Sequence, residues 1–161
     1  MIQAADLRLL FVGMLVLGAV TGIAAYDKSI EQLRLDTSQN DWESYVGGVS
    51  DGYEFEYFRS CRCPDRGPFQ VIVDSAGNVA SAIYLADSDT PGAVADPKQV
   101  MTVEEAHDDI QRALDKPAHK LDVTYAPAAE GGYPTFVYID WHRRIVDEET
   151  SFTIRNVALI E

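Results

Sequence analysis

The pair Cys61 and Cys63, separated only by Arg62, has the clearest chemical potential in the sequence. A regular strand holds residues i and i+2 about 6.5–7 Å apart at Cα, at or beyond the comfortable range for a disulfide. Pro64 follows directly and can supply the bend that a bridge requires. We therefore predict an intramolecular Cys61–Cys63 disulfide, whose very short loop fixes a turn and contributes little chain entropy.

Two other uses of the cysteine pair stay open. The basic neighbours Arg59, Arg62 and Arg66 favour a reactive thiolate, although the C-x-x-C spacing at a helix start is absent. Metal or cluster ligation needs further ligands, and the three histidines of the chain are scattered without an i+4 pair. A thiol-redox or metal-binding protein centred on Cys61 and Cys63 is therefore the alternative interpretation.

Two acidic clusters, Asp87-Ser88-Asp89 with Asp96 and Asp147-Glu148-Glu149, are the other candidates for ion binding. Calcium takes six to eight oxygen ligands, and the EF-hand spacing with its central glycine and terminal glutamate is missing. The composition is that of solvated acidic loops. We predict no metal ligands and no cofactor.

Two polar residues in apolar surroundings are expected to have structural rather than catalytic roles. We expect Asp140, within an apolar strand, to cap backbone at the strand's end, and His107, on an apolar helix face, to be a hydrogen-bonded core histidine. The nucleophile-elbow, zinc-protease, phosphate-loop and dinucleotide motifs are all missing from the sequence. We therefore predict no catalytic residue, and a protein that is not an enzyme.

The uncharged stretch Leu9–Ala25 sets the expected compartment. It is longer than the apolar part of most signal peptides and slightly shorter than a typical membrane span. We expect a membrane anchor or a cleaved signal peptide, with the rest of the chain outside the cytoplasm: at the outer face of the cytoplasmic membrane if anchored, or periplasmic or extracellular if cleaved.

Length and charge limit the remaining possibilities. Of the 161 residues, 47% are apolar, which fits one globular domain, and the net charge of −13 disfavours nucleic acid as a partner. We divide the chain into a signal or anchor (1–25), a linker with a short helix (26–40) and a single domain (41–161). Within 26–52 we expect a helix over 26–35, a break at Thr37–Asn40, and a further turn that ends at Gly47-Gly48.

Alternating apolar residues predict strands over 53–63, 69–73, 79–85, 121–125, 135–141 and 151–159. A helix over 102–115 begins at the T-x-x-E capping box of Thr102 and Glu105 and ends at Pro117. This order predicts an α+β fold, β-β-β-α-β-β-β, with an antiparallel sheet of about six strands and one packed amphipathic helix. Strand 135–141 has apolar residues in both phases, so we expect it to be covered on both faces. The predicted core residues are Trp42, Tyr45, Tyr53, Phe55, Tyr57, Val71, Val73, Ile110, Phe136 and Ile139.

An ordered set of short motifs resembles the bacterial domain-of-unknown-function 6174 family over about residues 40–159. The motifs are Trp42-x-x-Tyr45, Tyr53–Cys63, Val71-x-Val73-Asp74-x-x-Gly77-x-Val79, Thr102–Glu105, Val123–Tyr125, Gly132–Pro134, Ile139-Asp140 and Asp147-Glu148. The chain departs from the pattern by lacking a lipoprotein cysteine and by carrying His107 where a large apolar residue is expected. The resemblance implies an exported or lipid-anchored protein and supplies no reaction.

Together these observations favour a non-catalytic cell-envelope domain that binds a protein or a small ligand. The expected partners are an envelope protein or small ligand, with the N-terminal segment in contact with the membrane and no nucleic acid bound.

Overall fold

The computed structural model describes residues 28–47, 51–60, 66–86, 88, 90–116, 118–142, 144–145 and 148–160. The apolar segment Leu9–Ala25 and the predicted Cys61–Cys63 disulfide lie outside these residues. No helix within the described ranges is both long enough and apolar enough to cross a membrane. The compact unit that contains the sheet spans Leu35–Glu161.

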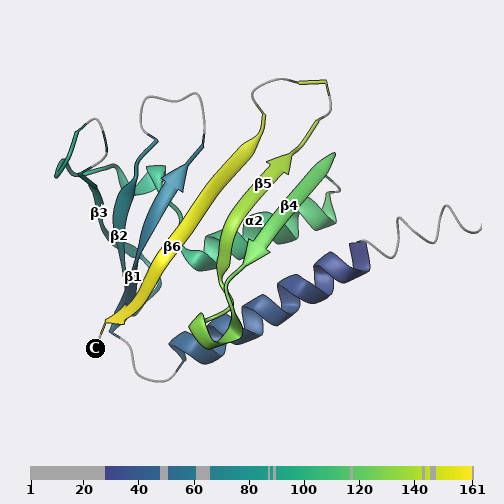
Figure 1. Ribbon diagram of the computed structural model, residues 1–161, viewed down its shortest axis with the longest axis horizontal. Helices are drawn as coiled ribbons and strands as arrows, with labels where there is room; N and C mark the ends of the chain where they lie inside the picture. The colour runs from purple at the N-terminus through teal and green to yellow at the C-terminus, as the bar shows by residue number, and fades with distance from the viewer. Residues whose placement is uncertain are drawn as a thin grey trace, which may run out of the picture. The chain divides into compact units, whose positions relative to one another are not determined.

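The fold of this unit is α+β, with one six-stranded antiparallel sheet and a helix between its third and fourth strands (Figure 1). The strand order is β3-β2-β1-β6-β5-β4, so the first strand and the last strand pair at the centre of the sheet. This confirms the predicted class and element order. The strands are β1 (Gly52–Arg59), β2 (Phe69–Asp74), β3 (Val79–Tyr84), β4 (Lys120–Tyr125), β5 (Pro134–Asp140) and β6 (Thr150–Ile160).

Helix α2 (Val103–Asp115) crosses one face of the sheet. It begins as predicted, because the Thr102 hydroxyl accepts a hydrogen bond from Glu105 N at 3.2 Å and the Glu105 carboxylate accepts one from Thr102 N at 2.8 Å. Its buried side follows helical spacing through Val103, Ala106, His107, Ile110, Ala113 and Leu114. Two short 3-10 turns, η1 (Pro97–Gln99) and η2 (Ala128–Glu130), shape the connections before α2 and β5.

The N-terminal helix α1 runs without interruption through residues 28–46, so the break predicted at Thr37–Asn40 is wrong. Polar residues favour helix ends when their side chains compete for nearby backbone. Here Asn40 Nδ2 donates to the Asp36 carbonyl at 2.7 Å, and Ser44 Oγ donates to the Asn40 carbonyl at 2.8 Å, both four residues back. The buried Ser38 bonds to groups outside the helix. These polar side chains are therefore hydrogen-bonded within an intact helix or to groups outside it, and they do not end the helix.

The core lies on one face of the sheet, between the strands and the helices. Phe55, Tyr57, Val71 and Val73 are fully buried there, and the buried face of β5 is made by Val137 and Ile139. The prediction that Phe136 is a core residue is wrong, because its side chain is 39% exposed. Phe136 of β5 and Phe58 of β1 both pair with Thr153, on the face that no described helix covers. Strand β5 is therefore covered on one face only.

Trp42 joins α1 to this core. It is 2% exposed, and its ring meets Tyr53 edge-on at a centroid distance of 4.9 Å. We expect Trp42→Ala to lower the free energy of unfolding by about 3–5 kcal/mol, because a large buried ring leaves a cavity. Phe136→Ala, which removes a ring from the open face, is the matched control and should cost much less. Chemical denaturation of both variants checks this, and equal losses would contradict the assignment of the two faces.

Candidate functional site

A buried serine–histidine contact links α1 to α2. Ser38 Oγ lies 2.7 Å from His107 Nε2 and donates its own proton to the Gly132 carbonyl at 2.6 Å. A serine hydroxyl has one proton, so the bond to Gly132 makes Nε2 of His107 the donor toward Ser38. A catalytic dyad needs the opposite direction, with the histidine accepting the serine proton. The pair therefore acts as a structural link, as expected for His107 from its place on the apolar helix face.

Burial holds this histidine neutral. Loss of solvation lowers the pKa of His107 from 6.5 to about 4, and the nearby Glu104 and Asp108 carboxylates only partly oppose that shift. The neutral imidazole is the form that donates through one nitrogen alone.

The close approach of α1 to the loop before β5 depends on two glycines. Gly131 has a φ of +98° and Gly132 a φ of +62°. A Cβ atom at Gly131 would lie 2.8 Å from Tyr45 Cδ1, and one at Gly132 would lie 2.7 Å from Asp41 Cβ. These positions permit both the left-handed backbone and the contact that presents the Gly132 carbonyl to Ser38.

The Glu104 carboxylate joins three elements at the start of α2. Trp42 Nε1 of α1 donates to one oxygen at 2.8 Å, and the Tyr53 hydroxyl of β1 donates to the other at 2.6 Å. The Tyr53 hydroxyl also accepts from Val103 N at 3.1 Å, which satisfies one of the unpaired amides of the helix terminus. Burial first, and then the hydrogen bond and the negative charge of Glu104, raise the pKa of Tyr53.

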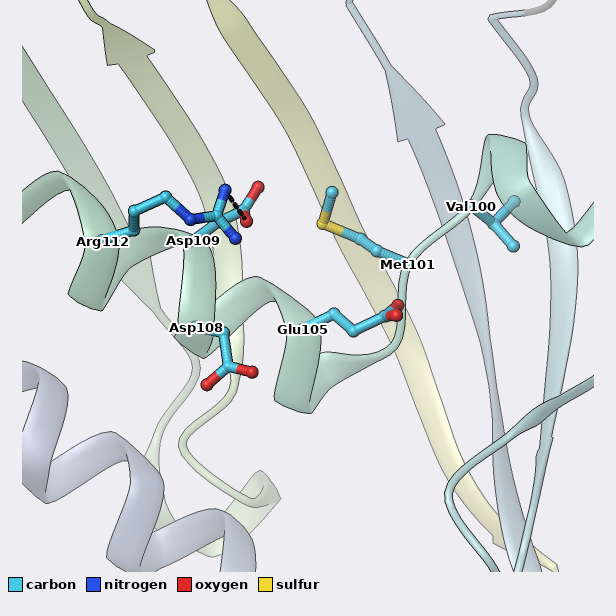
Figure 2. A pocket seen from close by; sticks show the side chains of 6 residues that line it. All are labelled: Val100, Met101, Glu105, Asp108, Asp109 and Arg112. Atoms are coloured by element: carbon cyan, nitrogen blue, oxygen red, sulfur yellow. Dashed lines mark ion pairs between the residues drawn. The ribbon is translucent and has the colours of Figure 1, made fainter.

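Two adjoining hollows lie between α2, the 97–101 segment and the ends of β1 and β6. The acidic hollow has a volume of about 370 Å³ and is lined by Val100, Met101, Glu105, Asp108, Asp109 and Arg112 (Figure 2). Arg112 Nη1 forms an ion pair with Asp109 Oδ1 at 2.9 Å. Burial raises the pKa of Asp109, and the Arg112 guanidinium opposes this rise. Three carboxylates thus share one hollow with one guanidinium.

The basic hollow, of about 190 Å³, shares Val100, Met101 and Asp109 with the acidic hollow. Its cationic side chains are Arg59, from the end of β1, and Lys98, from η1. Thr150, Ser151 and Phe152 of β6 line it as well. The two hollows therefore adjoin. Arg59 and Lys98 line only the basic hollow, and Asp109 lines both. Glu105, Asp108 and Arg112 line only the acidic hollow.

Tyr57 lines the basic hollow from the core side. Its side chain is only 1% exposed, and its ring packs on Phe69 and Phe152 at centroid distances of 6.3 and 5.9 Å. Burial raises the pKa of Tyr57. The positive charge of Arg59 opposes this rise, and the negative charge of Asp109 adds to it; both residues line the hollow. Within the described part of the chain, this hydroxyl makes no hydrogen bond. The ring is buried, but the hydroxyl is not one of the polar atoms of the described residues that are both shielded from solvent and unbonded.

The structure separates the predicted site residues. Cys61, Cys63, Asp87, Asp89 and Asp147 lie outside the described residues, although the strand end next to the cysteines is defined by a bond from Arg59 N to the Arg66 carbonyl at 3.0 Å. No group of three or more potential ligands among the described residues is placed to hold a metal ion.

The remaining acidic residues have structural contacts. Asp96 caps η1 by accepting from Lys98 N at 3.0 Å, and Asp140 accepts from His142 N at 3.1 Å at the end of β5. Glu148 contacts His142 Nδ1 at 2.5 Å. Each of these contacts is local to a turn or strand end.

Sequence reasoning identified Tyr57 as a core residue and missed its hydroxyl, and it missed Arg59, Lys98, Asp109 and Arg112 as lining residues. Two signals were present in the sequence. Strand alternation places Tyr57 on the inward face, and the i,i+3 spacing of Asp109 and Arg112 indicates an ion pair on one helix face. The approach of β1 and η1 to α2 has no sequence signal.

The structure is that of a small α+β domain whose sheet is covered by helices on one face, with two adjoining charged hollows beside α2. Residues 34–159 match the family of unknown function DUF6174, and the chain belongs to that family. No curated protein and no solved structure matches the chain.

The depressed pKa of His107 predicts a loss of stability in acid. Between pH 6.5 and about pH 4 the unfolded chain binds a proton that folded His107 does not, so stability falls as the pH falls through this window. His107→Gln keeps a donor for Ser38 and removes the titration. We expect the wild type to lose up to about 3 kcal/mol more than this variant between pH 7 and pH 4. Denaturant titrations at both pH values measure the difference, and parallel losses would show that His107 does not titrate this way.

Two tyrosines on the same strand provide a second test. Tyr53→Phe removes the bond to the Glu104 carboxylate and the acceptor for Val103 N, so we expect a loss of about 1.5–3 kcal/mol. Tyr57→Phe removes a hydroxyl without a described partner and should change the free energy of unfolding by less than about 0.5 kcal/mol. Thermal or chemical unfolding of the two variants compares them directly. A large loss for Tyr57→Phe would mean that its hydroxyl already has a partner in the protein.

Proposed function

We propose that the domain is a non-catalytic binding module held outside the cytoplasm, and that the two adjoining hollows form its ligand site. The observation that carries the proposal is Tyr57, a buried side chain that lines the basic hollow and whose hydroxyl makes no hydrogen bond in the described part of the chain. A bound polar ligand would supply the missing acceptor or donor.

The hydrogen bonds of the buried polar side chains support a non-catalytic function. The Ser38 proton is committed to the Gly132 carbonyl, and Glu104 is occupied by Trp42 and Tyr53. Neither group is left to act as nucleophile or general base. The sequence also lacks the nucleophile-elbow, zinc-protease, phosphate-loop and dinucleotide motifs.

Size and polarity favour a small ligand over a macromolecule at this site. A hollow of about 370 Å³ lies at the lower end of the range for small-molecule sites, roughly 300–1,000 Å³. The apolar Val100 and Met101 lie in the shared part, with charged groups on both sides. Such a lining fits a ligand with a short apolar centre and polar ends.

The location outside the cytoplasm is supported by the uncharged stretch Leu9–Ala25, which has the composition of an anchor or an export signal. A net charge of −13 is also compatible with a soluble domain that does not bind nucleic acid.

Filling the hollows tests this function. The full chain, labelled with ¹⁵N in a neutral detergent, would be titrated with small fragments that carry amino, carboxyl or hydroxyl groups. We expect amide shifts to cluster at Val100, Asp109 and Ser151. Met101→Trp, which fills the shared part, should abolish them, and Ile83→Trp, on the open face of the sheet, should not. The spectrum of each free variant shows whether it is folded. Shifts that cluster elsewhere, or that persist in folded Met101→Trp, would refute the proposed site.

A further inference from the structure

We infer that the ligand of the two hollows is a zwitterion, an amino acid or short peptide that carries a free ammonium group and a free carboxylate. This inference rests on the proposed binding function and adds the chemical class of the ligand. It follows from the way in which charge is divided along the shared lining.

The basic hollow fits the carboxylate. Arg59 and Lys98 provide the two cations, and guanidinium groups bind carboxylates with paired N–H donors. Tyr57 lines this hollow from the core side, and its hydroxyl is the donor that it would offer to a ligand. A carboxylate held there would accept a hydrogen bond from the Tyr57 hydroxyl, for which the described residues provide no hydrogen bond.

The acidic hollow fits the ammonium group. Figure 2 shows the carboxylates of Glu105, Asp108 and Asp109 carried by the same stretch of α2. Arg112 neutralises one of them through its ion pair with Asp109 at 2.9 Å. Two negative charges in excess remain around this hollow, which an ammonium group with three N–H donors would balance.

Ligands with one charge fit less well. An anion alone would leave the acidic hollow without a cation from the ligand and would approach a protein with a net charge of −13. A cation alone would fill the acidic hollow and bring no anionic group to Arg59 and Lys98 of the basic hollow. The zwitterion satisfies both ends with its apolar part against Val100 and Met101.

Three matched peptides test the ligand class on the ¹⁵N-labelled full chain. L-Ala-L-Ala carries both charges, N-acetyl-L-Ala-L-Ala lacks the ammonium group, and L-Ala-L-Ala amide lacks the carboxylate. We expect L-Ala-L-Ala to shift the amides of the hollow residues and to bind at least about tenfold more tightly than either analogue, as loss of one charge-assisted contact predicts. An analogue that binds equally well, or a dipeptide that leaves the hollow residues unshifted, would overturn the inference.

Variants assign each end of the peptide. Tyr57→Phe should weaken L-Ala-L-Ala and leave the weaker binding of the amide unchanged, because the amide has no carboxylate to lose. Asp108→Asn should weaken L-Ala-L-Ala and leave the N-acetyl peptide unchanged. Tyr138→Phe and Asp122→Asn, on β5 and β4, are the matched controls and should alter neither. Equal effects of the site and control variants would also overturn the inference.

The two proposals fail in different ways. If small fragments shift the hollow residues while the three peptides bind alike, the binding site stands and the zwitterion is wrong. If the fragments bind elsewhere and Met101→Trp has no effect, the site itself is wrong.

Discussion

The carboxylate of Glu104 is the contact on which the arrangement of the domain depends. It accepts from Trp42 of α1 at 2.8 Å and from Tyr53 of β1 at 2.6 Å, and it lies in the first turn of α2. A negative charge in a first turn also interacts favourably with the helix dipole. One side chain thus links the start of α2 to the sheet through Tyr53 and to the end of α1 through Trp42. The Ser38–His107 contact adds a second link one turn further along α2.

The sequence predicted the elements that local patterns determine. Period-two alternation identified the six strands to within a few residues, and Thr102 with Glu105 gave the start of α2. It did not predict that α1 is continuous, since Ser38 and Asn40 look like helix breakers until their hydrogen-bond partners are known. It also assigned Phe136 to the core, because alternation shows which residues share a face but not whether that face is covered.

The hollows could not be predicted from the sequence for a different physical reason. Their lining brings together Arg59, Lys98 and Asp109, which come from β1, η1 and α2. These elements come together through the tertiary fold, and local sequence patterns do not encode that approach. The acidic character of α2 was visible, but an acidic helix face is ordinarily solvated. What distinguishes this one is that Val100 and Met101, in the segment that leads into α2, line a hollow together with its charged side chains.

Tyr57 belongs both to the packed core and to the lining of the candidate site. The ring of Tyr57 is held by Phe69 and Phe152, so the packing of the sheet decides where its hydroxyl lies. Phenylalanine would fill the same space, and the core therefore does not account for the hydroxyl. No described group bonds this hydroxyl, and it is not one of the described polar atoms that are both shielded from solvent and unbonded, so it is open to a partner in the space beside it. That space is bordered by cations from β1 and η1 and by carboxylates from α2, so the fold places a donor of the core where a charged ligand would meet it.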